Sequence, residues 1–240
     1  TTGGSTGNPM QLYIPKKRYS YELPVVHEIW SRFGWDYNTR GVIRNHKLAK
    51  DQVYRTQPFT KEIIFDAFRL NSTYVREIYN ELKRREIRFL QCYASSAYLF
   101  CKIAKSLDLD LSFIKTIFTS SEGVLDYQRY FIEVDMGIKI SNFYGHSEKL
   151  VIAGDCMQSS NMHFEPTYGF CELLDKNENA INRPGEFGEI VATGYNNFGM
   201  FLIRFKTGDY AEYVGNRCDK CGRSGLIVRD IVGHWDDNII

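Results

Sequence analysis

The sequence lacks an excess of either charge, a long apolar run and the cysteine density of a disulfide-stabilised scaffold. Its formal net charge is +1 at pH 7, so no global field favours nucleic acid or an acidic membrane surface as a partner. We find no stretch long enough to span a bilayer and expect neither a signal peptide nor membrane insertion. Six cysteines among 240 residues suggest reduced thiols or a metal site in the cytoplasm.

Helical and strand patterns alternate through the first part of the chain, which contains no internal repeat. Apolar residues recur at helical spacing in four segments, the first interrupted by Pro24: 17–33, 72–86, 95–107 and 124–136. Short apolar runs predict strands at 41–44, 87–93, 113–120 and 138–145. This alternation predicts an α/β fold with a mostly parallel sheet, flanking helices and right-handed crossovers. Ligands bind such sheets at the carboxyl ends of the strands.

Shorter strands and turns replace this alternation from about residue 151 onward. The change predicts a smaller β-rich subdomain beside the α/β part. We therefore expect an α/β nucleotide-binding subdomain over 1–150 and a β-rich subdomain over 151–240.

The run GGSTGNP, residues 3–9, suits a polyphosphate. Several glycines allow consecutive backbone N–H groups to point into one concavity, and Ser5 and Thr6 add hydroxyl donors. It is not a Walker motif, because no Gly-Lys-Ser/Thr follows. Taken alone, the run also fits a flexible terminus.

Three later stretches favour a phosphate-binding loop over a flexible terminus: NFYGHSEK (142–149), LIRFKTGD (202–209) and VRDIVGHWDD (228–237). In this order the four stretches resemble the adenylate-forming superfamily, which includes acyl-CoA synthetases and peptide-synthetase adenylation domains. Thr2–Pro9 is similar to its phosphate loop, 144–148 to its adenine motif and 207–209 to its ribose motif. The phenylacetate–CoA ligase branch, with its relatives in capsular polysaccharide biosynthesis, is most similar, because CDKCGR follows IRFKTGD.

The resemblance implies ATP, Mg²⁺ and CoA as ligands and a small-molecule carboxylate as substrate. It implies that Ser147 contacts the α-phosphate or the substrate carboxylate, and that Glu148 is the Mg²⁺ ligand. Asp209 would accept hydrogen bonds from the ribose hydroxyls. The other nucleotide-binding candidates are Thr2, Gly3, Gly4, Ser5, Thr6, Gly7, Glu122, Tyr144, Gly145 and His234. Glu122 is the weakest of them, because TSSEGV (119–124) lacks the proline of the family's turn near adenine.

Two positions depart from the family pattern. Asn8 stands where the phosphate loop often has a lysine, a change that many relatives share. His234 stands where the family has an arginine that helps to hold the nucleotide and supports the hinge. Histidine is shorter and has a different donor geometry, so we expect altered nucleotide affinity or closure.

The cysteines give a separate signal. Cys218 and Cys221 form a C-x-x-C motif, and Cys156 and His163 lie upstream. Three thiolates and one imidazole suffice for a structural Zn²⁺ site, although C-x-x-C also fits a redox pair or two idle thiols. Members of the phenylacetate–CoA ligase branch look similar in carrying a Cys/His knuckle here, which favours zinc. Cys92 and Cys101 are expected in the core, and Cys171 is undecided.

The predicted function is the nucleotide-binding core of an AMP-forming carboxylate–CoA ligase. Family members carry a segment upstream of the phosphate loop and a mobile C-terminal domain with a catalytic lysine. The resemblance therefore implies the middle of a longer protein, which would bind nucleotide better than it turns over. The alternatives are a catalytically degenerate binding or assembly module and a different ATP-dependent enzyme such as a kinase. A homodimer and the acyl substrate are left open.

Overall fold

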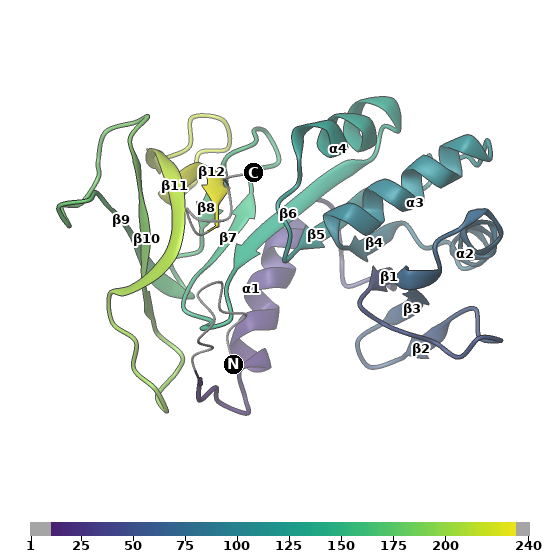
Figure 1. Ribbon diagram of the computed structural model, residues 1–240, viewed down its shortest axis with the longest axis horizontal. Coiled ribbons are helices and arrows are strands. Elements are labelled where there is room, and N and C mark those ends of the chain that lie inside the picture. Colours follow the sequence, from purple (N-terminus) through teal and green to yellow (C-terminus); the bar gives the residue numbers. More distant parts are fainter. Residues whose placement is uncertain (1–10, 234–240) are drawn as a thin grey trace. The chain divides into compact units, whose positions relative to one another are not determined.

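The computed structural model describes residues 11–233 and divides the chain into two compact units (Figure 1). Unit 2 comprises Trp30–Asn142, and unit 1 combines the residues before it with those from Phe143 onward. The N-terminal segment therefore belongs with the second half of the chain. The two units are defined by contacts between residues, whereas a domain is a part of the chain that could fold alone. The division into domains 1–150 and 151–240 therefore stays a prediction.

Unit 2 is built on a parallel sheet. Its strands are β1 (Arg40–Arg44), β2 (Arg55–Gln57), β3 (Glu62–Asp66), β4 (Phe89–Cys92) and β5 (Thr116–Ser120). Strands β3, β1, β4 and β5 lie parallel in that order, and the short β2 pairs antiparallel with β3. This arrangement confirms the predicted α/β fold with a mostly parallel sheet.

Helices α2 (Ser72–Arg84) and α3 (Ala94–Ser106) pack against each other and against the strands of unit 2. Helix α2 begins where Asn71 accepts a hydrogen bond of 3.0 Å from the backbone N–H of Tyr74, the usual role of an N-cap residue. Its buried stripe includes Val75, Ile78 and Leu82, spaced as one face of a helix. The sequence after β5 also forms helical turns: α4 (Asp126–Tyr130) and the π-helix Phe131–Asp135.

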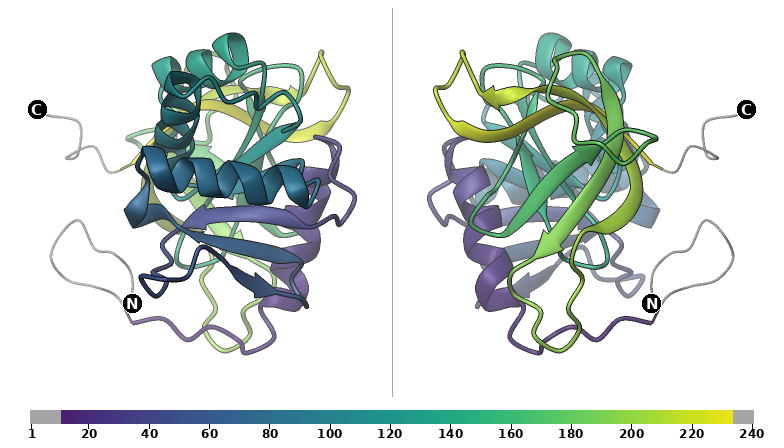
Figure 2. Two further views of the ribbon diagram at one scale, coloured as in Figure 1. Left: turned by 90° about the vertical axis from the view of Figure 1, so that its right-hand side faces the viewer. Right: turned by 90° about the vertical axis from the view of Figure 1, so that its left-hand side faces the viewer.

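Unit 1 is an antiparallel sheet with its own core. Strand β6 (Lys139–Gly145) enters the unit at Phe143. It is followed by β7 (Ile152–Asp155), β8 (Met162–Phe164), β9 (Gly169–Leu174), β10 (Phe187–Gly194), β11 (Phe205–Arg217) and β12 (Ser224–Val232). Their spatial order is β6-β7-β8-β12-β11-β10-β9. In the right-hand view of Figure 2, β10 and β11 are the long green and yellow-green strands that run side by side. The β-rich part expected from the sequence is therefore present, although the unit that contains it is not the smaller of the two.

Helix α1 (Tyr19–Ser31) begins in unit 1 and continues through Pro24, which lies on its exposed side. Ile29 packs so closely on Gly154 of β7 that a Cβ there would lie 2.6 Å from the isoleucine side chain. Across residues 11–233, no helix combines the length and the apolar content needed to cross a membrane.

Candidate functional site

A bulge in β11 positions Asp209. On strands β10 and β11, Lys206 pairs with Val191, and Tyr210 pairs with Glu189. Three residues of β11, 207–209, therefore face a single residue of β10. Within the bulge, Gly208 has a φ of +77°, a conformation that glycine adopts without strain. The Thr207 hydroxyl accepts a hydrogen bond of 3.1 Å from the backbone N–H of Asp209. Such bulges turn a side chain out of the regular alternation of a strand, here the carboxylate of Asp209.

Tyr144 on β6 meets this carboxylate. Its hydroxyl donates a hydrogen bond of 2.6 Å to Oδ2 of Asp209. Oδ1 of Asp209 receives no hydrogen bond from the residues that the structure describes, so it can accept one from a ligand. Burial and the negative charge of Asp209 both raise the pKa of Tyr144, so the phenol is neutral and acts as a donor.

This contact requires the sheet of unit 1 to curl. Three strands, β7, β8 and β12, lie between β6 and β11. In a flat sheet, four steps of about 4.8 Å would hold them about 19 Å apart. The register of β11 against β12 shifts near Glu212 and again on both sides of Gly215. Bulges increase local twist and bend a strand, and they explain how the two distant strands approach each other.

The rest of the predicted adenine motif forms the turn after β6. Gly145 and Ser147 are exposed, and Glu148 is largely buried. Nδ1 of His146 lies 2.9 Å from Oε2 of Glu148. Burial acts to raise the pKa of Glu148, but the contact with His146 and a hydrogen bond from the backbone N–H of Glu148 together lower it, so the carboxylate is ionised.

His146 was not among the predicted site residues. Its side chain is 8% exposed, and its Nε2 is buried without a hydrogen-bond partner among the described residues. Its ring centroid lies 6.0 Å from that of Tyr144. Because ionised Glu148 is only an acceptor, Nδ1 of His146 carries the proton of this hydrogen bond. The two-residue spacing of His146 and Glu148 was the only signal of this pair in the sequence.

Glu122 lies in unit 2, at the carboxyl end of β5. Its carboxylate accepts hydrogen bonds from the backbone N–H and the hydroxyl of Ser95, at 3.0 and 3.1 Å, at the start of α3. It lines a cavity of about 400 Å³ at the carboxyl ends of β1, β3 and β4, where ligands bind in open α/β sheets. Phe68, Tyr93 and Leu99 give this cavity apolar walls.

Some predicted residues lie outside the described range. They are Thr2, Gly3, Gly4, Ser5, Thr6, Gly7 and His234. Their roles stay predictions, as do those of Glu122, Tyr144, Gly145, Ser147, Glu148 and Asp209.

The structure brings the four predicted knuckle residues together. Cys156 follows β7, His163 lies on β8, and Cys218 and Cys221 lie in the turn between β11 and β12. One ligand atom from each lies within 4.8 Å of all the others, and three of the four residues are buried. The Sγ atoms of Cys156 and Cys218 are 4.0 Å apart. Tetrahedral Zn²⁺ with Zn–S bonds of about 2.3 Å would set neighbouring sulfurs about 3.8 Å apart.

Neighbouring groups hold this cluster in place. Arg223 donates two hydrogen bonds of 2.9 Å to the buried carboxylate of Glu165, two residues after His163. Burial acts to raise the pKa of the Cys218 thiol, but the backbone N–H groups of Cys221 and Lys220, together with the neighbouring thiols, lower it overall, whereas burial first of all raises the pKa of Cys221. A thiol favoured as thiolate is the form that binds a metal ion. The donor set and spacing therefore fit a tetrahedral metal ion.

The remaining cysteines behave differently. Cys92 and Cys101 are fully buried, as predicted, and burial raises the pKa of Cys101 to about 12. Cys171 is half-buried on β9, and burial raises its pKa as well. Buried thiols of this kind remain protonated and unreactive.

No protein-family model matches the sequence, and no curated protein is significantly similar to it. Solved structures do share the fold. A 2-hydroxyisobutyryl-CoA ligase in complex with 2-HIB-AMP and CoA is 19% identical, with a TM-score of 0.74 over 98% of this chain and 52% of that one. The anthranilate CoA ligase AuaEII in complex with anthranoyl-AMP is 14% identical, with a TM-score of 0.55 over 89% and 43%. VinN is 13% identical, with a TM-score of 0.62 over 95% and 59%.

The chain thus spans about half the length of the solved structures that it matches. At these identities the similarity concerns the fold alone. The chain thus shares its α/β fold with these CoA ligases.

Proposed function

We propose that this chain is the nucleotide-binding part of an ATP-dependent carboxylate–CoA ligase. One observation carries the proposal: Tyr144 and Asp209, 65 residues apart in the sequence, share a hydrogen bond of 2.6 Å. The predicted adenine and ribose motifs thus meet at one place in unit 1. The similarity of the fold to ligases solved with acyl-AMP and CoA supports the same reading.

In the proposed reaction, a carboxylate oxygen of the substrate attacks the α-phosphorus of ATP. The bond from that phosphorus to the bridging oxygen breaks, and pyrophosphate leaves with the electron pair. A thiol, which we propose to be that of CoA, then attacks the acyl carbonyl, loses its proton and displaces AMP. Catalysis of this kind depends on positioning and on neutralising developing negative charge.

The residues of unit 1 would bind and orient the nucleotide. Asp209 would accept a ribose hydroxyl at Oδ1, while its bond to Tyr144 fixes the carboxylate. The ring of Tyr144 would contact the adenine base. Ser147 is exposed and free to donate to the α-phosphate or the substrate carboxylate. Glu148 would hold Mg²⁺ on the phosphates, since it is ionised and a hard oxygen ligand.

We further propose that Cys156, His163, Cys218 and Cys221 bind a structural Zn²⁺ ion. The ligand spacing described above and the lowered pKa of Cys218 support this assignment. The ion would tie the turn after β7 and strand β8 to the turn between β11 and β12. Membership of the phenylacetate–CoA ligase branch and a cytoplasmic location are parts of the same proposal.

ATP–pyrophosphate exchange with a panel of carboxylic acids tests the proposed activity. We expect exchange with at least one acid, AMP as the nucleotide product, and loss of exchange in Asp209→Ala. A matched control is Asp51→Ala, an exposed aspartate in the turn before β2. ADP as the product would instead identify a kinase-type reaction and refute the ligase.

A catalytically degenerate binding or assembly module is the second candidate. The pairing of His146 with the largely buried Glu148 favours it, because one oxygen of the proposed Mg²⁺ ligand is already occupied. ATP binding without exchange, for every acid tested, would support the module and contradict the ligase.

A further inference from the structure

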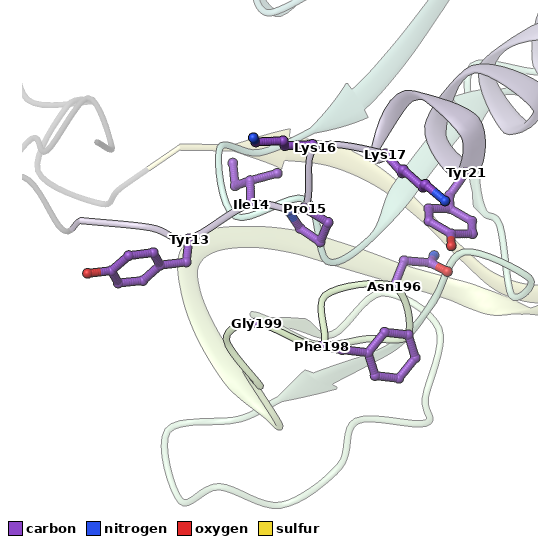
Figure 3. A pocket seen from close by; sticks show the side chains of 9 residues that line it. All are labelled: Tyr13, Ile14, Pro15, Lys16, Lys17, Tyr21, Asn196, Phe198 and Gly199. Carbon is purple, nitrogen blue, oxygen red and sulfur yellow. The ribbon is translucent and has the colours of Figure 1, made fainter.

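A cavity of about 390 Å³ lies in unit 1, where the segment before α1 meets the loop between β10 and β11. Figure 3 shows its lining residues: Tyr13, Ile14, Pro15, Lys16, Lys17, Tyr21, Asn196, Phe198 and Gly199. Its volume falls in the usual range for small-molecule pockets, roughly 300–1,000 Å³. None of the residues given roles above lines it.

Specific hydrogen bonds form the walls of this cavity. The side chain of Asn197 donates a hydrogen bond of 2.7 Å to the backbone carbonyl of Tyr13, which joins the loop to the N-terminal segment. Its Oδ1 accepts from the backbone N–H groups of Gly199 and Met200, both at 3.2 Å. This turn presents Phe198, which is 72% exposed. Phe201 and Ile203 of the same loop are also exposed, and a group of exposed apolar side chains is typical of a binding surface.

The charge of the lining is of one sign. Lys16 and Lys17 contribute two ammonium groups, and no carboxylate lines the cavity. Within the described part of the chain, neither lysine forms an ion pair. In Figure 3, Lys17 reaches toward Tyr21, whereas Lys16 extends in another direction. Tyr21 and Phe198 contribute aromatic side chains to the lining, and Tyr21 is the one that lies next to Lys17 in Figure 3.

We infer that this cavity binds a planar aromatic ring that carries phosphate. Aromatic side chains stack on any heterocyclic base, and unpaired lysines attract phosphate oxygens. A purine nucleotide has both features, and two sources can supply it: a free adenine nucleotide or the adenosine 3′,5′-bisphosphate end of CoA. The assignment to CoA rests on the proposed function. Binding of a free adenine nucleotide in this cavity does not, since it is independent of ATP binding at Tyr144 and Asp209.

Calorimetric titration with adenosine 3′,5′-bisphosphate and, separately, with AMP tests the inference. We expect binding that weakens as salt is raised, because the contacts to phosphate are exposed and screened. Phe198→Ala should weaken it on the order of ten-fold, from the loss of one stacked ring. Lys17→Glu should weaken it at least as much. Both probes are compared in Asp209→Ala, so that the proposed ATP site does not contribute: tighter binding of the bisphosphate than of AMP identifies the CoA end, and equal or weaker binding identifies a free nucleotide.

Matched controls separate this site from the proposed ATP site. Phe170→Ala removes another exposed phenylalanine, and Lys176→Glu makes the same charge change elsewhere; both should leave the titrations unchanged. Asp209→Ala should also leave binding of the bisphosphate intact. The inference is overturned if neither probe binds, if Phe198→Ala and Lys17→Glu bind like the parent, or if Asp209→Ala abolishes binding. Thermal melting of each variant confirms that it is folded.

Discussion

Removing the hydroxyl of Tyr144 tests whether the contact with Asp209 holds the two motifs together. The bond is short, at 2.6 Å, and its acceptor is a carboxylate. Hydrogen bonds to charged groups contribute roughly 1.5–3 kcal/mol to stability. Both residues are half-buried rather than buried, so solvent weakens the bond. We therefore expect Tyr144→Phe to lower the free energy of unfolding by about 1–2 kcal/mol.

A double-mutant cycle with Asp209→Asn isolates this interaction. Unfolding in urea would be followed for the parent chain, both single variants and the double variant. Once either partner is changed, the second change should cost less, with a coupling energy of about 1 kcal/mol or more. Tyr195→Phe, at an exposed tyrosine, serves as a control and should change stability by less than about 0.5 kcal/mol.

The same variants separate stability from nucleotide binding. Tyr144→Phe keeps the ring proposed to contact adenine, so ATP affinity should fall only a few-fold, on the order of one lost hydrogen bond. Asp209→Asn removes the charge proposed to receive the ribose hydroxyl and should cost on the order of ten-fold or more. Additive effects on unfolding, within about 0.3–0.5 kcal/mol, would refute the argument that this bond joins the motifs.

Three further predictions concern the knuckle, a buried glycine and a histidine. Cys218→Ser should abolish stoichiometric zinc measured by atomic emission in the purified protein, whereas Cys171→Ser should retain it; equal zinc in both would contradict the proposed site. Gly169→Ala should cost about 3 kcal/mol or more in urea unfolding, because its Cβ would lie 1.9 Å from a backbone carbonyl oxygen, whereas Gly123→Ala has open space and should be tolerated. Burial and nearby arginines lower the pKa of His46, so the unfolded chain binds the proton more readily than the folded chain does. The free energy of unfolding should therefore fall as the pH drops below about 6.5, the ordinary pKa of histidine. If His46→Gln shows the same fall with pH as the parent chain, this prediction is wrong.

Elements with a strong period were predictable from the sequence. The segments 72–86 and 95–107 carry helical stripes and fold as α2 and α3, and 113–120 contains β5. The strands β2 and β3, between 55 and 66, were not predicted. Strand β3 has only three consecutive apolar residues, Ile63–Phe65, and β2 is exposed throughout. Their pairing is decided by neighbouring strands, which a local pattern does not reveal.

The candidate site was predictable in its members but not in its geometry. Short motifs identified Tyr144 and Asp209, and the chemistry of Cys and His identified the knuckle. The pair formed by His146 and Glu148 was missed, because a spacing of two residues in a turn has no strong meaning by itself. The grouping of the N-terminal segment with the second half of the chain was also missed. Both depend on contacts that form only after the chain has folded.

The curl of the unit 1 sheet explains why the positions of these side chains relative to one another could not be predicted from the sequence. Tyr144 and Asp209 lie on strands with three others between them, and their contact needs β11 to bend sharply. The knuckle draws on the turns at the ends of β7 and β11, strands that also lie inside this curl. A bound metal ion would therefore brace the same curvature that brings Asp209 to Tyr144. The two motifs supply Tyr144 and Asp209, but the bulges in β11 bend the strand and bring these side chains together in one candidate site.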